Sequence, residues 1–138
     1  MQLILVSHGN LAKGMAQTLA MIIGEQSNIT ALAAYNDDKI DVTQQLKQAI
    51  ITAEQQHQPL VILTDIFGGS VNNEATQLLL QYPHVFVIAG MNLALTLALA
   101  THDGAIDAQQ IKQLVQESQA SIVFVNDQLN TVQEEDEL

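Results

Sequence analysis

Short runs of aliphatic residues alternate along the chain with longer segments in which apolar residues recur every three to four positions. The short runs predict buried strands and the longer segments predict amphipathic helices. The expected strands are Gln2–Val6, Ile29–Ala34, Leu60–Thr64, Val85–Ala89 and Ile122–Val125. The expected helices contain the apolar positions Leu11 to Ile23, Val42 to Ala53, Ala75 to Leu79, Leu93 to Ala100 and Ile111 to Val115.

Strands that alternate with helices in this way indicate an α/β fold with an open, mainly parallel sheet and helices on both faces. Capping residues mark several helix ends. Gly24 is placed to end the first helix and Asp41 to begin the second, and Asp107 with Gln110 has the spacing of a capping box. No linker or repeat interrupts the pattern, so we expect one domain over residues 1–130 and an acidic tail over 131–138.

The loops after the first and third strands carry the residues best suited to catalysis or ligand binding. The first strand leads into Ser7-His8-Gly9-Asn10 and the third into Asp65-Ile66-Phe67-Gly68-Gly69-Ser70. In open α/β sheets, ligands bind beyond the carboxyl ends of the strands, where the strand order reverses. If the first and third strands are neighbours, as in the order 2-1-3-4, His8 and Asp65 come within contact distance.

Such a pair is suited to nucleophilic chemistry. A carboxylate bonded to one ring nitrogen of His8 fixes the tautomer and leaves the other nitrogen as a nucleophile. Gly68 and Gly69 let the backbone approach an anion, and Ser70 begins a helix whose free N–H groups favour phosphate. Each residue taken alone also fits an ordinary turn or helix cap. It is their predicted convergence that favours a phosphoryl site.

Composition removes several other classes of function. The chain has no Cys, and its formal charge of −11 comes from fifteen acidic residues against four Lys. That charge argues against nucleic acid as a partner. It suits a basic protein partner, and it fits equally well with a charge that only keeps the domain in solution. His57, His84 and His102 lie in turns or at helix ends, and no His pair has metal-ligand spacing, so neither a metal nor a cofactor is expected. No apolar run is long enough to span a membrane and no signal peptide precedes the first strand, so the sequence predicts a cytoplasmic protein.

Taken in order, three stretches resemble the IIA domain of the mannose-type bacterial sugar phosphotransferase system. They are Val6-Ser7-His8-Gly9, then Asp65 to Ser70, and finally Ile88-Ala89-Gly90-Met91-Asn92-Leu93. The resemblance extends over nearly the whole chain.

This resemblance implies a sheet in the order 2-1-3-4 and a homodimer that exchanges the strand near Ile122–Val125. It implies a phosphotransferase component in which His8 accepts a phosphoryl group from the phosphocarrier HPr and delivers it to a histidine of the IIB component. The membrane components IIC and IID then use the phosphoryl group during sugar uptake, which implies indirect association with the membrane. Asp65 would orient His8, and Gly68, Gly69 and Ser70 would hold the phosphoryl group. Ser7, Phe67 and Asn92 are candidate contacts at the rim or with partners.

Two departures from the family pattern bear on partner fit. The family usually has Pro-Phe-Asn after Gly-Gly-Ser, where this chain has Val71-Asn72-Asn73, and often has Pro where this chain has Ala94. Two related functions stay open: the phosphoryl donor subunit of dihydroxyacetone kinase, and a regulatory domain that is phosphorylated only as a signal. A response-regulator receiver would need an acidic pair after the first strand, where this chain has Ser7-His8. A binding protein without chemistry would not take up phosphate on His8.

Overall fold

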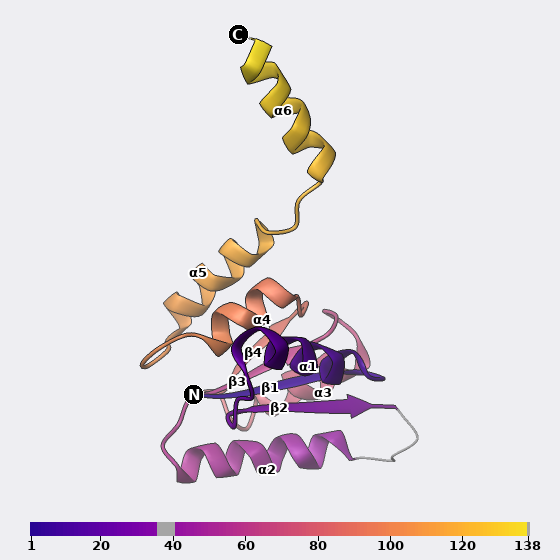
Figure 1. Cartoon of the computed structure of the whole chain (residues 1–138). Coiled ribbons are helices and arrows are strands. Elements are labelled where there is room, and N and C mark those ends of the chain that lie inside the picture. The colour runs from indigo at the N-terminus through magenta and orange to yellow at the C-terminus, as the bar shows by residue number, and fades with distance from the viewer. Residues whose placement is uncertain (36–40, 138) are drawn as a thin grey trace.

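A parallel sheet of four strands forms the centre of the protein (Figure 1). The computed structural model describes residues 1–35 and 41–137. The strands are β1 (Gln2–His8), β2 (Ile29–Ala34), β3 (Leu60–Thr64) and β4 (Phe86–Ala89). The helices are α1 (Leu11–Ile23), α2 (Val42–Gln55), α3 (Ser70–Leu78), α4 (Leu93–Ala100), α5 (Ala108–Gln119) and α6 (Val125–Glu137).

The strand order β2-β1-β3-β4 confirms the expected topology, and every pairing among these strands is parallel. Val6 lies beside Thr64 on β3, and His8 lies beside Ala34 on β2. The carboxyl ends of β1, β2 and β3 therefore lie together at one end of the strands, the end toward which the β2 arrow points in Figure 1. This register brings the loops after the three strands together.

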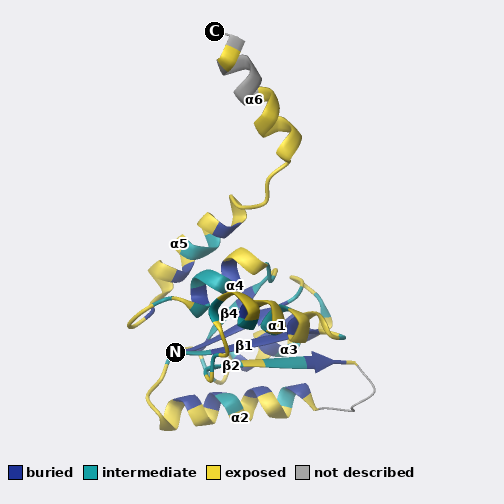
Figure 2. Ribbon diagram, in the orientation of Figure 1, coloured by how far each residue is buried: buried dark blue, intermediate teal, exposed yellow. Residues whose placement is uncertain are grey.

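Alternate residues of the interior strands pack into two separate cores, one on each face of the sheet. Ile4 and Val6 face α2 and α3, whereas Leu3 and Leu5 face α1, α4 and α5. All four side chains are buried (Figure 2). This two-sided burial explains why the strand residues form continuous aliphatic runs.

The caps that the sequence predicts are present. The side chain of Asp41 accepts a hydrogen bond from Gln44 N–H at the start of α2, and Asp107 forms a reciprocal capping box with Gln110 at the start of α5. Gly24 ends α1 at a φ of 81°, a conformation that glycine adopts without strain.

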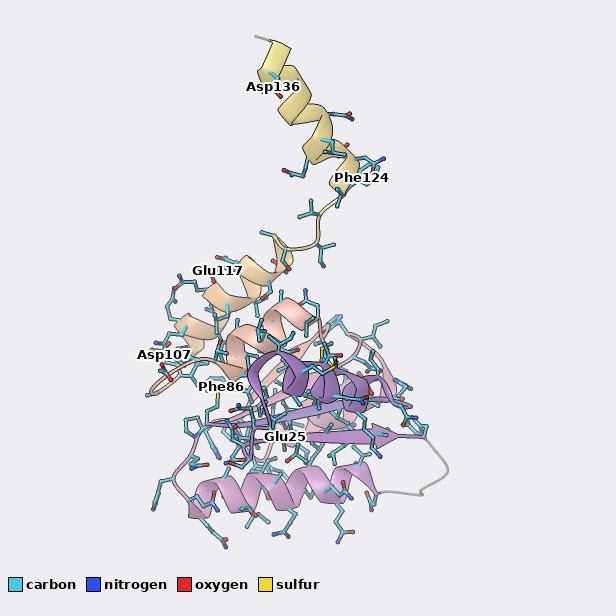
Figure 3. All side chains as sticks on the ribbon, viewed as in Figure 1. Glu25, Phe86, Asp107, Glu117, Phe124 and Asp136 are labelled. Carbon is cyan, nitrogen blue, oxygen red and sulfur yellow. The ribbon has the colours of Figure 1, made fainter. Side chains whose placement is uncertain are left out.

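Within this chain no strand forms at Ile122–Val125, because Val125 begins α6 and the residues before it are not paired with any described strand. A strand needs a neighbour to satisfy its backbone, and α5 directs this segment away from the sheet (Figure 1). Phe124 stands at the base of α6, well apart from the core (Figure 3). The side chains of Ile122, Phe124 and Val125 are all exposed. The tail expected over residues 131–138 falls within α6 up to Glu137, and Leu138 lies outside the described residues.

Candidate functional site: a histidine held by a carboxylate

His8 is the last residue of β1, and its ring points into the loop that follows β3. Its Nδ1 lies 2.7 Å from Oδ2 of Asp65, and its backbone N–H donates to the same oxygen at 2.8 Å. The side chain of His8 is 45% exposed and that of Asp65 only 10%. The structure therefore brings the predicted pair together, with the carboxylate beneath and the imidazole open to solvent.

Asp65 is held in its ionised form. Partial burial alone would raise the pKa of this carboxyl, but the hydrogen bonds from the backbone and ring of His8, together with the nearby ring charge, outweigh burial and lower the pKa below its ordinary value. An ionised carboxylate only accepts hydrogen bonds, so the Nδ1 atom that faces it carries the proton. When the ring carries only this one proton, its lone pair is on Nε2.

Ser70 approaches the second ring nitrogen, since its Oγ lies 3.1 Å from Nε2 of His8. Ser70 is also the first residue of α3, and the loop before it turns through Gly68 at a φ of 80°. A side chain at Gly69 would be crowded, because a Cβ there would lie 2.8 Å from Cγ2 of Ile66 and 3.5 Å from Cε1 of His8. The two glycines thus allow the start of α3 to come close to the ring of His8.

Of the three rim candidates, only Phe67 is prominently exposed, at 85%. Ser7 is fully buried, so the rim placement expected for it is wrong: its hydroxyl accepts a hydrogen bond from Ala12 N–H at 2.7 Å and secures the start of α1. The side chain of Asn92 caps α4 through Leu95 N–H and reaches the carbonyl of Ser118. Asn92 therefore joins α4 to α5.

Asn72, one of the departures from the family pattern, is buried in a matched pair. The hydroxyl of Thr64 donates to its Oδ1 at 2.8 Å, and the two side chains are 0% and 4% exposed. This bond ties the end of β3 to the first turn of α3. The sequence did not predict the pair, because Thr64 was placed only at a strand end and Asn72 was noted only as a departure from the family pattern.

Tyr35 is a further neighbour of His8 that the sequence analysis missed. It follows Ala34, the residue paired with His8, and the centroids of the two rings are 5.3 Å apart. The strand-end rule that identified His8 and Asp65 applies equally to the loop after β2, so a signal for Tyr35 was available.

Other kinds of site find no support among the described residues. No group of three or more His, Cys, Asp or Glu side chains is arranged there to hold a metal ion. No helix in the same part of the chain is both long and apolar enough to cross a lipid bilayer.

Comparisons with known proteins agree on one family. The sequence model for EIIA-man, described as the PTS system fructose IIA component, matches residues 2–119. The sorbose-specific EIIA component of Klebsiella pneumoniae is 29% identical over 133 residues, which are 96% of each chain.

Solved structures show the same likeness. The PTS IIA protein associated with the fucose utilization operon of Streptococcus pneumoniae has a TM-score of 0.80 at 27% identity, covering 93% of this chain and 95% of its own. A putative phosphoenolpyruvate-dependent sugar phosphotransferase permease from Klebsiella pneumoniae has a TM-score of 0.76 at 33% identity, covering 93% of both chains.

Proposed function

The chain belongs to the mannose- and fructose-type IIA family of the bacterial sugar phosphotransferase system, as its motifs indicated, and we propose that Nε2 of His8 is its phosphoryl acceptor. IIA components of this system mediate phosphoryl transfer. The observation that carries the proposal is the arrangement of the His8 ring, with Nδ1 bonded to Asp65 and Nε2 directed toward Ser70.

In the proposed reaction, the lone pair on Nε2 attacks the phosphorus of a phosphohistidine on the donor. The donor P–N bond breaks and its electron pair returns to the donor ring. His8 then carries the phosphoryl group on Nε2 and a proton on Nδ1, so its ring is formally cationic beside the Asp65 carboxylate. The Ser70 hydroxyl and the free N–H groups at the start of α3 are placed to receive the phosphoryl oxygens. Transfer onward is the same step in reverse, with the next histidine as nucleophile.

We propose phospho-HPr as the donor and a histidine of the IIB component as the acceptor, in keeping with the family. The formal charge of −11 supports basic partner surfaces, because opposite fields speed encounter. The proposal places the protein in the cytoplasm and brings it to the membrane only through the IIC and IID components. It treats residues 1–130 as the IIA domain and residues 131–138 as an acidic tail.

The same proposal includes a homodimer joined by the segment before α6. β4 is an edge strand of the sheet, and a groove of about 620 Å³ beside it has a mixed lining, apolar at Val87 and Val115 and polar at Gln116 and Gln119. An uncovered strand edge and an exposed apolar segment are both aggregation hazards. Residues 122–124 of a second copy, laid along β4, would cover both at once.

Phosphorylation in vitro tests the central proposal. The protein is incubated with phosphoenolpyruvate, HPr and the enzyme that transfers the phosphoryl group from phosphoenolpyruvate to a histidine of HPr, and the mass of the product is measured by mass spectrometry. One phosphate should appear, stable in base and labile in acid, and it should be absent from the His8→Ala variant. His84 provides a matched control because it is also exposed and paired with a carboxylate, but there Nε2 itself lies 2.9 Å from Oε1 of Glu54. The His84→Ala variant should be phosphorylated like the wild type, and label retained in His8→Ala would overturn the proposal.

A further inference from the structure

The ring of Tyr35 lies beside the His8 imidazole. The two ring centroids are 5.3 Å apart and the ring planes are inclined by 32°, so the contact is a tilted stack. Tyr35 is the first residue after β2, and Ala34 before it pairs with His8 in the sheet. The backbone N–H of Gly9 also donates to the carbonyl of Ala34 at 2.9 Å. The β2 pairing thus fixes the position of Tyr35 relative to His8.

The backbone of Tyr35 adopts a conformation that its side chain disfavours. Its φ is +57°, in the left-handed region where a bulky residue is an outlier. Residues in such conformations persist when their surroundings hold them, and they gather at active sites. At this position the strained backbone places an aromatic ring on a reactive histidine.

The hydroxyl of Tyr35 contributes little to this placement. It lies 3.5 Å from Oε1 of Glu74, which is longer than the usual distance for an O–H donor. The residue as a whole is 64% exposed, so its ring is not held in the protein core. Among the described residues, the contact with His8 is the aromatic contact of this ring.

We propose that Tyr35 is a positioning residue that stabilises the phosphorylated form of His8, an inference that rests on the proposed function. When Nε2 bears the phosphoryl group and Nδ1 keeps its proton, the imidazole carries a formal positive charge. An aromatic face within about 6 Å of a cation attracts it. Asp65 meets this charge through Nδ1, and the tilted ring of Tyr35 lies within that distance of the imidazole.

The attraction favours the phosphorylated state over the transition state for its loss. In hydrolysis, water attacks the phosphorus and the P–Nε2 bond breaks with its electron pair left on Nε2. The products are inorganic phosphate and a neutral imidazole still protonated on Nδ1. Because the positive charge on the ring fades as the bond breaks, an interaction with that charge slows the reaction. The same interaction shifts the equilibrium with phospho-HPr toward phosphorylated His8.

The test compares four variants of the full chain with the wild type. Tyr35→Leu removes the aromatic face, Tyr35→Phe removes only the hydroxyl, and Tyr35→Trp enlarges the face. Tyr82→Leu is the matched control, since Tyr82 packs edge-on against His84, away from the site. For each protein, two quantities are measured: the phosphorylated fraction at equilibrium with HPr, and the rate at which the isolated phosphoprotein releases phosphate across the neutral pH range.

We expect Tyr35→Leu to release phosphate about three-fold faster and to shift the equilibrium toward HPr by a similar factor, the size typical of an exposed cation–π contact. Tyr35→Phe should keep most of the wild-type lifetime, and Tyr35→Trp should lengthen it. Tyr82→Leu should match the wild type in both measurements.

Two results would overturn the inference while leaving the proposed function intact. One is that the wild type is phosphorylated, but the Tyr35→Leu phosphoprotein has the same lifetime and the same equilibrium with HPr as the wild type. The other is a Tyr35→Phe protein that releases phosphate as fast as Tyr35→Leu. If Tyr35→Leu does not fold, a Tyr35→Trp lifetime no longer than that of Tyr35→Phe would count against the inference in the same way. A wild type that accepts no phosphate from HPr would instead overturn the proposed function.

Discussion

One oxygen atom of Asp65 holds both the ring and the backbone of His8. Oδ2 accepts from Nδ1 at 2.7 Å and from the backbone N–H at 2.8 Å, while Oδ1 accepts from Ile66 N–H at 3.1 Å. The carboxylate thus joins the ends of β1 and β3 and sets the ring orientation at the same time.

Asp65→Asn should slow phosphoryl uptake by about 10²–10⁴-fold, the range for loss of a group that assists proton placement or catalysis. An asparagine can turn its amide N–H toward Nδ1, which then becomes an acceptor and moves the ring proton to Nε2. That tautomer has no lone pair where the phosphorus must bind. Rapid-quench measurement of uptake from phospho-HPr gives the rate, with Asp103→Asn as a control at an exposed acidic residue remote in sequence from the site. Unchanged uptake by Asp65→Asn would assign the orienting role to another group.

Ser70→Ala should have a smaller effect, about three- to tenfold, which corresponds to one ordinary hydrogen bond. The hydroxyl lies 3.1 Å from Nε2, but the backbone N–H groups at the start of α3 stay in place when it is removed. The same rapid-quench assay applies. A loss as large as that in Asp65→Asn would mean that the hydroxyl, and not the backbone, is the main phosphoryl contact.

Acid should remove a part of the stability that Asp65 contributes. The pKa of Asp65 is lowered in the folded protein from an ordinary 3.8, so the unfolded state binds more protons between the two values. The contribution is complete above about pH 3.8 and is lost as the pH falls through the lowered pKa. Denaturant unfolding of wild type and Asp65→Asn between pH 2 and 6 should therefore show a steeper acid loss for the wild type. Parallel curves would refute the assignment.

Thr64 and Asn72 should behave as an energetically coupled pair. Thr64→Val leaves the buried Oδ1 of Asn72 without its donor, and Asn72→Leu leaves the Thr64 hydroxyl without its acceptor, each at a cost of about 1–3 kcal/mol. The double variant replaces both polar groups and should lose less than the sum of the single changes. Equilibrium unfolding of the wild type, the two single variants and the double variant completes a double-mutant cycle. If the losses in unfolding free energy of the single variants simply add in the double variant, the 2.8 Å bond contributes no coupling.

If the homodimer forms through residues 122–124, folding and association are linked, and the melting temperature should rise with protein concentration. Truncation before Ser121 removes the segment together with α6 and should give an aggregating product instead of a folded monomer. Sedimentation of a monomer at micromolar concentration, with a melting temperature independent of concentration, would exclude this dimer.

Regular patterns carried most of the prediction. Continuous aliphatic runs located β1 to β4 to within a residue or two. The position of His8 and Asp65 at strand ends predicted their contact once the strand order implied by the family resemblance was added. What failed depended on contacts that sequence patterns do not record. Ile122–Val125 has a strand-like composition, but no strand of its own chain lies beside it. Its continuation Val125, Leu129 and Val132 has helical spacing, which was the available signal for α6. The buried hydroxyl of Ser7 accepts a hydrogen bond from Ala12 N–H, a contact that the sequence around Ser7, which resembles a loop, did not indicate.

His8 ends β1, an interior strand paired on both sides, whereas α6 extends from the body with exposed side chains at its start. Amide hydrogens of such an interior strand exchange with solvent only when most of the structure opens, while those of a projecting helix exchange early. The proposed acceptor nitrogen is therefore attached to the part of the protein that deforms least. If the proposal holds, the donor and the recipient must bind one after the other to this rigid ring, since both need the same open side of a single imidazole.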